Sequence, residues 1–215
     1  MLEKMAAFFE RRLDGYDEHM LTNIQSAREF YPFTAQNLPK EPGCHVLDLG
    51  CGTGLELEFY YPLNPTAKVT GIDLSKGMLD ALRAKFTDRD LELIQGSYFD
   101  ADLGEAAYDG AVSVESLHHF TQVEKTDLYR KVAKSLKTGA FFILTDYFAM
   151  SQEEENSFRR ELEQLKAEAG IQEGIYHFDT PLTVANETQA LLGGGFTKVE
   201  ILGAWGATAT LRATK

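Results

Sequence analysis

The chain has 215 residues, of which 44% are hydrophobic and 25% are charged. That length suffices for one domain with a sizeable core, and the composition is typical of a globular protein rather than a disordered or membrane-spanning one. Lysine and arginine number 21 against 33 acidic residues, so the formal net charge is −12. An acidic surface repels phosphate backbones, so a nucleic-acid partner is not expected.

Two cysteines, Cys44 and Cys51, flank the first predicted strand. Two thiols support no disulfide framework, and no second cluster offers the spacing of zinc ligands. We therefore expect reduced thiols and a cytoplasmic protein. The apolar run within residues 1–10 is short and interrupted by charge, so neither a signal peptide nor a membrane span is predicted there.

Residues 1–40 are predicted to be helical. Apolar side chains recur there with the spacing of one helix face, and Gly15 is expected to interrupt it. A helical segment at this place could cover a ligand pocket. Tyr16 and Tyr31 could reach that pocket, although packing in the core or at the surface is the preferred interpretation of both.

From residue 45 onward, predicted strands and helices alternate, which favours a parallel sheet with helices on its faces. No repeat or linker divides the chain, so one domain is expected over residues 1–215. Its parts are a helical cover (1–40), a ligand-binding core (41–150), a second helical, substrate-side region (151–192) and a terminal β-hairpin (193–215). Strands are predicted at 46–49, 68–73, 91–94, 108–114 and within 139–148, and in the hairpin at 196–201 and 207–214.

The most informative stretch runs from Val46 to Gly54 and reads Val-Leu-Asp-Leu-Gly-Cys-Gly-Thr-Gly. A buried strand that ends abruptly in glycines, ahead of a helical segment, lets the backbone approach a nucleotide-like ligand closely. Asp73 ends the next predicted strand, 23 residues after Gly50, where a carboxylate can accept hydrogen bonds from ribose hydroxyls. Nicotinamide enzymes use the same position, and a helix N-terminus also favours an acid there, so Asp73 alone does not name the cofactor.

The Asp-Leu-Gly-Cys-Gly-Thr-Gly string resembles the first motif of class I S-adenosylmethionine-dependent methyltransferases. Leu55 stands where the dinucleotide fingerprint needs glycine or alanine, which counts against a nicotinamide cofactor. The resemblance implies an α/β, Rossmann-like fold. Its seven-stranded sheet would have the order 3-2-1-4-5-7-6, with the last strand antiparallel and helices on its flanks.

The resemblance also implies S-adenosylmethionine as cofactor and assigns residues to it. Ser97 stands where the family often has an acid, and Tyr98 could wall the adenine or simply pack. The positions assigned to the cofactor are Asp48, Gly50, Cys51, Gly52, Gly54, Asp73, Leu74, Met78, Gly96, Ser97, Tyr98, Val114, Glu115 and Ser116.

His118 and His119 follow the fourth predicted strand, in the segment that resembles the one beside the transferred methyl group. We predict that they are the catalytic residues, with His118 as a candidate base and His119 toward the cofactor. A purely structural role for both is the competing hypothesis. No metal is predicted, because adjacent histidines on a loop rarely reach one ion and no acid or cysteine joins them at ligand spacing. Asp146, Tyr147, His177 and the rest of 176–179 are weaker candidates for a substrate chamber.

The implied function is methyl transfer to a small-molecule acceptor, in an oligomeric state that the sequence does not specify. Three alternatives remain: another S-adenosylmethionine-using enzyme of this fold, similar to carboxy-S-adenosylmethionine synthases; a nicotinamide-dependent oxidoreductase; and a cofactor-binding protein without catalysis. Gly195–Lys215 resembles the ending of both small-molecule methyltransferases and those synthases.

Overall fold

A computed structural model describes residues 2–215, so Met1 and the part of the N-terminal prediction that falls on it lie outside the described residues. The main sheet has seven strands in the order β4-β3-β2-β5-β6-β9-β8. Numbered along the core, this is 3-2-1-4-5-7-6, which confirms the predicted order. The strands are β2 (His45–Leu49), β3 (Lys68–Asp73), β4 (Leu91–Gln95), β5 (Tyr108–Val114), β6 (Leu136–Tyr147), β8 (Lys198–Trp205) and β9 (Thr208–Thr214).

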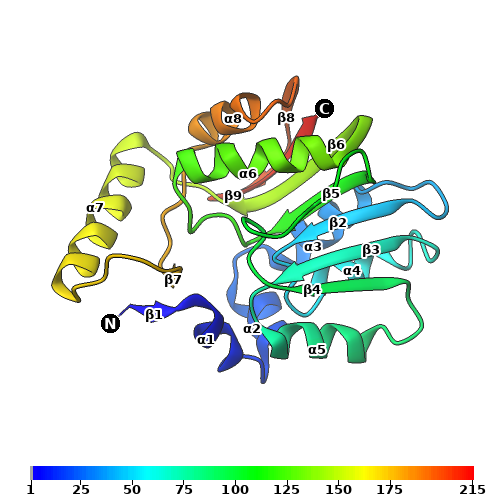
Figure 1. Ribbon diagram of the computed structural model, residues 1–215, viewed down its shortest axis with the longest axis horizontal. Helices are drawn as coiled ribbons and strands as arrows, with labels where there is room; N and C mark the ends of the chain where they lie inside the picture. The colour runs from blue at the N-terminus through cyan, green and yellow to red at the C-terminus, as the bar shows by residue number, and fades with distance from the viewer. Residues whose placement is uncertain (1) are drawn as a thin grey trace.

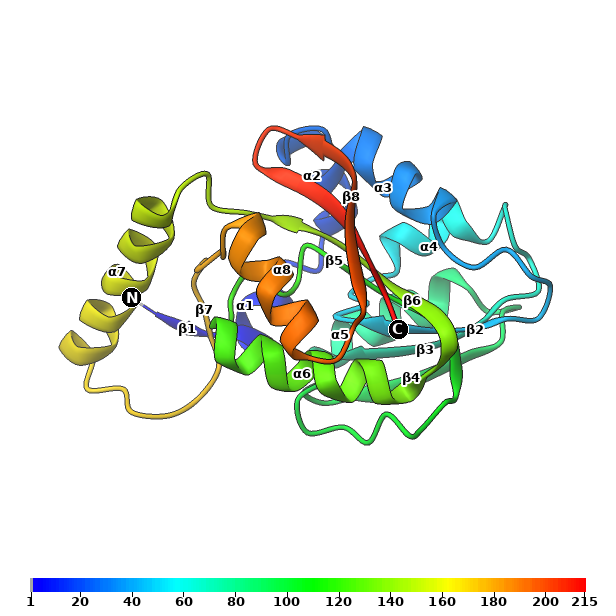
Figure 2. The same ribbon diagram turned by 90° about the horizontal axis from the view of Figure 1, so that it is seen from above.

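Six of the seven strands run in the same direction, and β9 is antiparallel to both of its neighbours, as predicted. Helices cover both faces, with α6 and α8 on one side in Figure 1 and α4 and α5 on the other. Figure 2 shows α6 and α8 lying across the sheet. The helices are α1 (Met5–Glu10), α2 (Tyr16–Asn23), α3 (Ala27–Gln36), α4 (Leu55–Tyr60), α5 (Lys76–Lys85), α6 (Gln122–Ser135), α7 (Gln152–Glu168) and α8 (Val184–Gly193).

The two faces of the sheet bury separate apolar clusters because successive strand side chains point to opposite sides. Leu47 and Leu49 of β2 belong to the cluster under α6 and α8. Val46, from the same strand, belongs to the cluster under α3 and α4. The two clusters hold the helices on the sheet and so fix where the strands end. A single domain over residues 1–215 remains a prediction.

The N-terminal cover differs in detail from the prediction. It contains three helices, since a second break at Ser26 (φ 60°) separates α2 from α3. It also contributes a strand, β1 (Glu3–Lys4), which pairs with β7 (Tyr176–His177). Periodicity within residues 1–40 could not predict this pairing, because the partner strand is more than 170 residues away.

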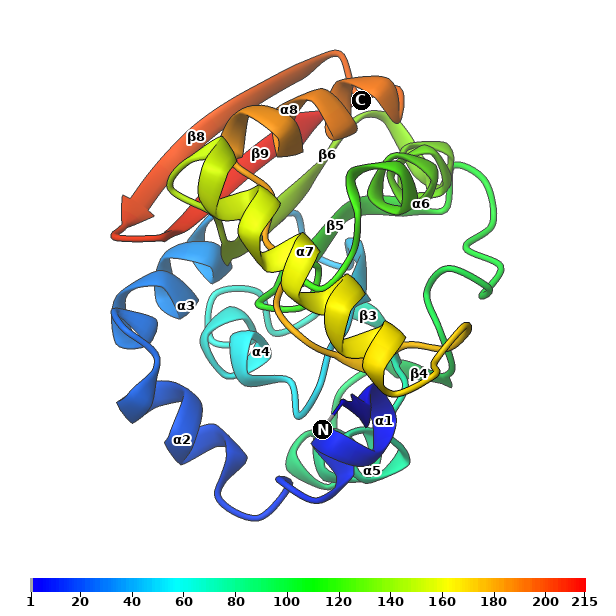
Figure 3. The same ribbon diagram turned by 90° about the vertical axis from the view of Figure 1, so that its left-hand side faces the viewer.

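The helical region after β6 also divides into two parts with different roles. In α7 only Glu155 is buried, and Figure 3 shows this helix crossing in front of the carboxyl ends of the strands. In contrast, α8 packs on α6, where Lys125 Nζ donates to Glu187 Oε2 at 2.5 Å inside the protein. Within residues 2–215, no helix has both the length and the apolar character needed to cross a membrane.

Two buried carboxyl groups face each other where β2 meets α4. Asp48 and Glu56 are 1% and 5% exposed. Burial raises the pKa of Asp48 well above its usual range, and the neighbouring Glu56 carboxyl raises it further. Burial also raises the pKa of Glu56, to about 7, although the hydrogen bond from Asp48 opposes this rise. The pair therefore stays protonated more readily than free carboxyl groups do.

This pair predicts a pH-dependent stability. The folded-state pKa of Glu56 lies above its unfolded value, so its contribution is fully present below about pH 4.5 and is lost as the pH rises through about 7. Replacing Glu56 by Gln should leave stability near pH 5 little changed and raise it by roughly 1–3 kcal/mol at pH 8, relative to the unmodified chain. Denaturant unfolding at the two pH values measures the difference.

The control is Glu58→Gln, which changes a more exposed carboxylate on the same helix. It should not stabilise the chain selectively at pH 8. If the Glu56→Gln and unmodified chains show the same change in stability from pH 5 to pH 8, the pair does not behave as described.

Candidate active site

The glycine turn after β2 forms one wall of the site. Gly50, Gly52 and Gly54 all have positive φ, at 73°, 48° and 72°, a region that favours glycine. A Cβ on Gly50 would lie 2.0 Å from Ser116 Oγ. The loop after β5 can therefore lie this close to the turn only because residue 50 is glycine. A Cβ on Gly52 would meet nothing within 4 Å. Gly52 thus leaves open space on the side where a ligand would lie.

Asp73 connects this turn to the next helix. Its Oδ2 accepts a hydrogen bond from the Gly52 amide at 3.0 Å, and its Oδ1 accepts one from the Ser75 amide at 2.8 Å. Burial raises the pKa of Asp73, while these amide hydrogen bonds work in the opposite direction. The carboxylate therefore fixes the position of the glycine turn at the carboxyl ends of β2 and β3.

A small cavity of about 40 Å³ lies against this turn. Of the residues predicted to bind the cofactor, seven line it: Gly50, Gly52, Asp73, Met78, Val114, Glu115 and Ser116. The N-terminal cover contributes Met5, Phe9 and Tyr16 to the same cavity, and His119 completes the lining. Tyr16 thus reaches the site, whereas Tyr31 is buried in the core under α3 and α4.

The other seven predicted cofactor residues line neither this cavity nor the larger one beside it: Asp48, Cys51, Gly54, Leu74, Gly96, Ser97 and Tyr98. Tyr98 is buried beneath the loop after β5, where its hydroxyl donates to the Ser116 carbonyl at 3.3 Å. Ser97 Oγ accepts from the Phe99 amide at 3.2 Å. In this arrangement these two side chains support neighbouring loops.

The cover is fastened to the core by acidic side chains. Glu10 Oε2 accepts from Ser75 Oγ at 2.6 Å and from the Gly77 amide at 3.2 Å, both at the start of α5. Asp17 accepts from the Thr53 hydroxyl in the glycine turn and from Lys85. These contacts hold α1 and α2 over the carboxyl ends of the central strands.

A second cavity, of about 680 Å³, adjoins the first. Phe9, Tyr16, Glu115 and His119 line both. The larger one is lined by five parts of the chain: the cover, the loop after β5, the end of β6, β7 with the segment after it, and the β8–β9 hairpin. Its most informative lining residues are Phe8, Arg11, Arg12, His118, Tyr147, His177, Asp179, Trp205 and Thr208.

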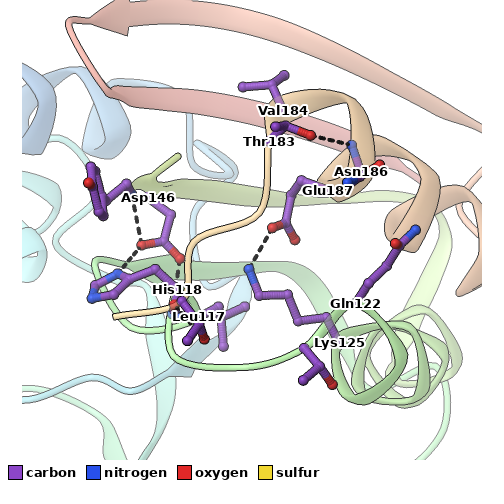
Figure 4. A network of polar contacts seen from close by, with 12 residues as sticks. Leu117, His118, Gln122, Lys125, Asp146, Thr183, Val184, Asn186 and Glu187 are labelled. Carbon is purple, nitrogen blue, oxygen red and sulfur yellow. Dashed lines mark hydrogen bonds and ion pairs between the residues drawn. The ribbon is translucent and has the colours of Figure 1, made fainter. Parts of the chain in front are cut away.

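His118 is held by the end of β6. Its Nδ1 lies 2.6 Å from Asp146 Oδ1, and Asp146 Oδ2 accepts from the Leu117 amide at 3.0 Å (Figure 4). Burial alone lowers the pKa of His118, but the negative charge and the hydrogen bond of Asp146 outweigh it and raise the pKa to about 9. Since Nδ1 faces Asp146, Nε2 is directed at Asp179, whose Oδ1 is 3.6 Å away.

His119 lies beside it in a different environment. Its Nδ1 is 3.2 Å from the Phe178 carbonyl and 3.3 Å from Asp179 Oδ1. Burial and the neighbouring His118 charge lower the pKa of His119. His177 is also close, with its ring stacked on Phe8 at a centroid separation of 3.4 Å. The segment 177–179 thus brings polar side chains against both loop histidines.

Glu115 is the third notable residue of the loop after β5. Its φ is 49°, which is unusual for a residue that is not glycine, and such strained backbone tends to occur at functional sites. Burial raises the pKa of its carboxyl to about 8, with a further contribution from Asp146. Since Glu115 lines both cavities, it lies where the two meet.

The sequence predicted several of the side chains that line the larger cavity, including Tyr147, His177 and Asp179. It missed Arg11, Arg12, Trp205 and Thr208, which line the larger cavity. For the last two a signal existed. The turn between the predicted hairpin strands 196–201 and 207–214 must lie at the carboxyl end of β6, because β9 returns antiparallel beside it.

Comparison with known proteins agrees with this geometry. Residues 46–139 match the family model described as "Methyltransferase domain". The chain is 36% identical over 112 residues to the cypemycin N-terminal methyltransferase of a Streptomyces species, covering 48% of this chain and 43% of that protein. It is 32% identical over 124 residues to an uncharacterized methyltransferase of Synechocystis, covering 58% and 57%. The chain spans about half the length of these curated relatives.

Among solved structures, human N-acetylserotonin methyltransferase in complex with SAM superposes with a TM-score of 0.68 at 16% identity. The match covers 98% of this chain and 56% of that one, and it shows a shared fold. The matched domain favours a methyltransferase over the nicotinamide-dependent alternative. Together with the sheet order and the glycine turn after β2, it supports the resemblance of this chain to class I methyltransferases.

Proposed function

We propose that the protein transfers a methyl group from S-adenosylmethionine to a small-molecule acceptor. The observation that carries this proposal is the pair of adjoining cavities that meet at Glu115 and His119. One lies against the glycine turn and Asp73, and the other is a chamber of about 680 Å³. That volume falls within the range of pockets for small ligands, roughly 300–1,000 Å³.

The cofactor side has features that suit an adenosine-containing ligand. Gly52 leaves space for a ligand to approach the backbone. A carboxylate offers about four acceptor positions, so Asp73 can accept from ribose hydroxyls while it retains its bonds to the Gly52 and Ser75 amides. When bound, S-adenosylmethionine supplies a methyl group that its sulfonium already activates. The chain then has to align the two reactants and exclude water, and alignment alone can lower the barrier by about 7–11 kcal/mol.

We propose that the cover moves when the cofactor enters. A cavity of about 40 Å³ has room for only a few waters, which is much less than the roughly 300–1,000 Å³ of pockets for small ligands. Phe9 and Tyr16 occupy the remaining space beside the glycine turn. Side chains of Glu10 and Asp17 hold α1 and α2 over the site, and the pairing of β1 with β7 lies outside the main sheet, so a displacement of these helices need not disturb the main sheet.

The acceptor side combines aromatic and charged groups. Phe8 and Trp205 supply apolar surface, and the guanidinium of Arg12 lies 3.6 Å from the centroid of the Phe8 ring. His118 and His119 remain the predicted catalytic residues, since both line the chamber and His119 also reaches the cofactor side. The same cavities suit the synthase alternative, while the methyltransferase relatives favour methyl transfer. A cytoplasmic location is also proposed, from two free and buried thiols.

Gly52→Val should abolish cofactor binding, because its side chain would fill the ligand's approach path. The matched control is Gly43→Val. Gly43 also has positive φ (73°) and open space around a Cβ, but it precedes β2 at the opposite end of the strand. Both variants should lose stability from backbone strain. Thermal unfolding is measured with and without S-adenosylhomocysteine. The ligand should raise the unfolding temperature of Gly43→Val but not that of Gly52→Val. A ligand-induced increase in Gly52→Val would contradict the placement of the cofactor beside Gly52.

Asp73→Ala should weaken the binding of S-adenosylhomocysteine by about 1–3 kcal/mol, because it leaves the ribose hydroxyls without an acceptor. Asp80→Ala removes an exposed carboxylate from α5, and its affinity should match that of the unmodified chain. Titration calorimetry on folded samples makes the comparison. An unchanged affinity in folded Asp73→Ala would remove Asp73 from the cofactor site.

A further inference from the structure

The loop histidines and the segment after β7 bring three potential metal ligands together. One donor atom from each of His118, His119 and Asp179 lies within 4.8 Å of the other two. The histidines are adjacent in sequence, and the acid follows 60 residues later. The prediction that no metal binds here rested on the lack of an acid near the histidines, and the fold supplies that acid.

The separations suit one small ion. Zinc holds nitrogen and oxygen ligands at about 2.0–2.2 Å, so neighbouring ligands in a tetrahedral site lie about 3.4 Å apart. Asp179 Oδ1 is 3.6 Å from His118 Nε2 and 3.3 Å from His119 Nδ1. These two distances are close to the edge lengths of such a tetrahedron, and the donor nitrogens of the two histidines lie within 4.8 Å of each other. A metal would therefore need to draw the two imidazoles together by about 1 Å at most.

The orientation of His118 favours coordination. Its Nδ1 faces Asp146, so the other ring nitrogen, Nε2, is the one directed at Asp179. A carboxylate that holds the far nitrogen of a histidine is the usual support of a metal ligand, since it fixes the ring and its tautomer. Asp146 is fully buried and is itself held by the Leu117 and Tyr147 amides.

The environment of Asp179 agrees with this. The side chain is 45% exposed, yet its Oδ1 atom is buried, lies near the ring nitrogens of His118 and His119, and accepts no hydrogen bond of good geometry from the described residues. A buried oxygen without a hydrogen bond is costly unless another group compensates it. Ion pairing with the histidines is one compensation, and a cation between them is the other. His119 would exchange its contact with the Phe178 carbonyl for the ion.

We propose that His118, His119 and Asp179 bind a divalent cation of the zinc type in the wall of the larger cavity. Three protein ligands leave a fourth position open, as in catalytic rather than structural zinc sites. All three ligands line the chamber in which the proposed function puts the acceptor, so an oxygen, nitrogen or sulfur atom of the acceptor is the expected fourth ligand. Metal binding itself is independent of that function, whereas the acceptor's contact with the metal rests on it.

The test is a titration of the chelator-treated protein with Co²⁺, followed by visible absorption, and then displacement by Zn²⁺. We expect one Co²⁺ per chain, with the intense bands of a low-coordinate site, and a loss of those bands when Zn²⁺ is added. Asp179→Asn should reduce Co²⁺ affinity at least tenfold, and Asp146→Asn by about 10–100-fold through its hold on His118. Asp14→Asn is the matched control, since Asp14 lines the same cavity without belonging to the ligand set.

The proposal is overturned if the unmodified chain shows no Co²⁺ bands, or if folded Asp179→Asn binds Co²⁺ as tightly as the Asp14→Asn control. Should Asp179→Asn fail to fold, the unmodified chain and Asp146→Asn decide in the same way. Thermal unfolding with S-adenosylhomocysteine on the same samples separates the two proposals. If the ligand raises the unfolding temperature but Co²⁺ does not bind, the metal proposal fails and the cofactor proposal stands. If Co²⁺ binds but the ligand does not raise the unfolding temperature, the cofactor proposal fails and the metal proposal stands.

Discussion

The carboxylate of Asp73 is the contact on which the site depends most. It accepts hydrogen bonds from the amides of Gly52 and Ser75, and so joins the glycine turn to the start of α5. The turn can lie there only because Gly50 has no side chain to strike Ser116. Backbone conformation, close approach and one buried acid together create the surface against which a cofactor can lie. The N-terminal cover rests on the same place through Glu10, which binds Ser75 and Gly77.

A second constraint acts across the larger cavity. Asp146, at the end of β6, holds the ring of His118, and the Thr180 amide donates to the His118 carbonyl at 2.8 Å. The segment after β7 is thereby attached to the loop after β5. The pairing of β1 with β7 attaches the cover to that same segment. The cover and the acceptor wall are therefore connected, and movement of one is expected to affect the other.

Local patterns predicted the sheet well. Strand alternation located the individual strands, and the glycine string located the small cavity, because both signals lie within a few consecutive residues. The order of the strands came from the resemblance to class I methyltransferases. The remaining errors concern contacts between distant segments. Nothing near Glu3 indicates a partner at His177, and nothing near His118 indicates that Asp179 lies beside it. Asp48 illustrates another limit, since it pairs with Glu56 inside the protein instead of lining a cavity. The string Asp-Leu-Gly-Cys-Gly does not show which way that side chain points.

The central claim is that the space between the glycine turn, Asp73 and the cover binds S-adenosylmethionine and not a dinucleotide. Titration calorimetry of the unmodified chain with S-adenosylhomocysteine and, separately, with NADH tests this claim most directly. The account predicts saturable binding of one S-adenosylhomocysteine per chain and no heat of binding with NADH. Saturable binding of NADH, with none of S-adenosylhomocysteine, would contradict it.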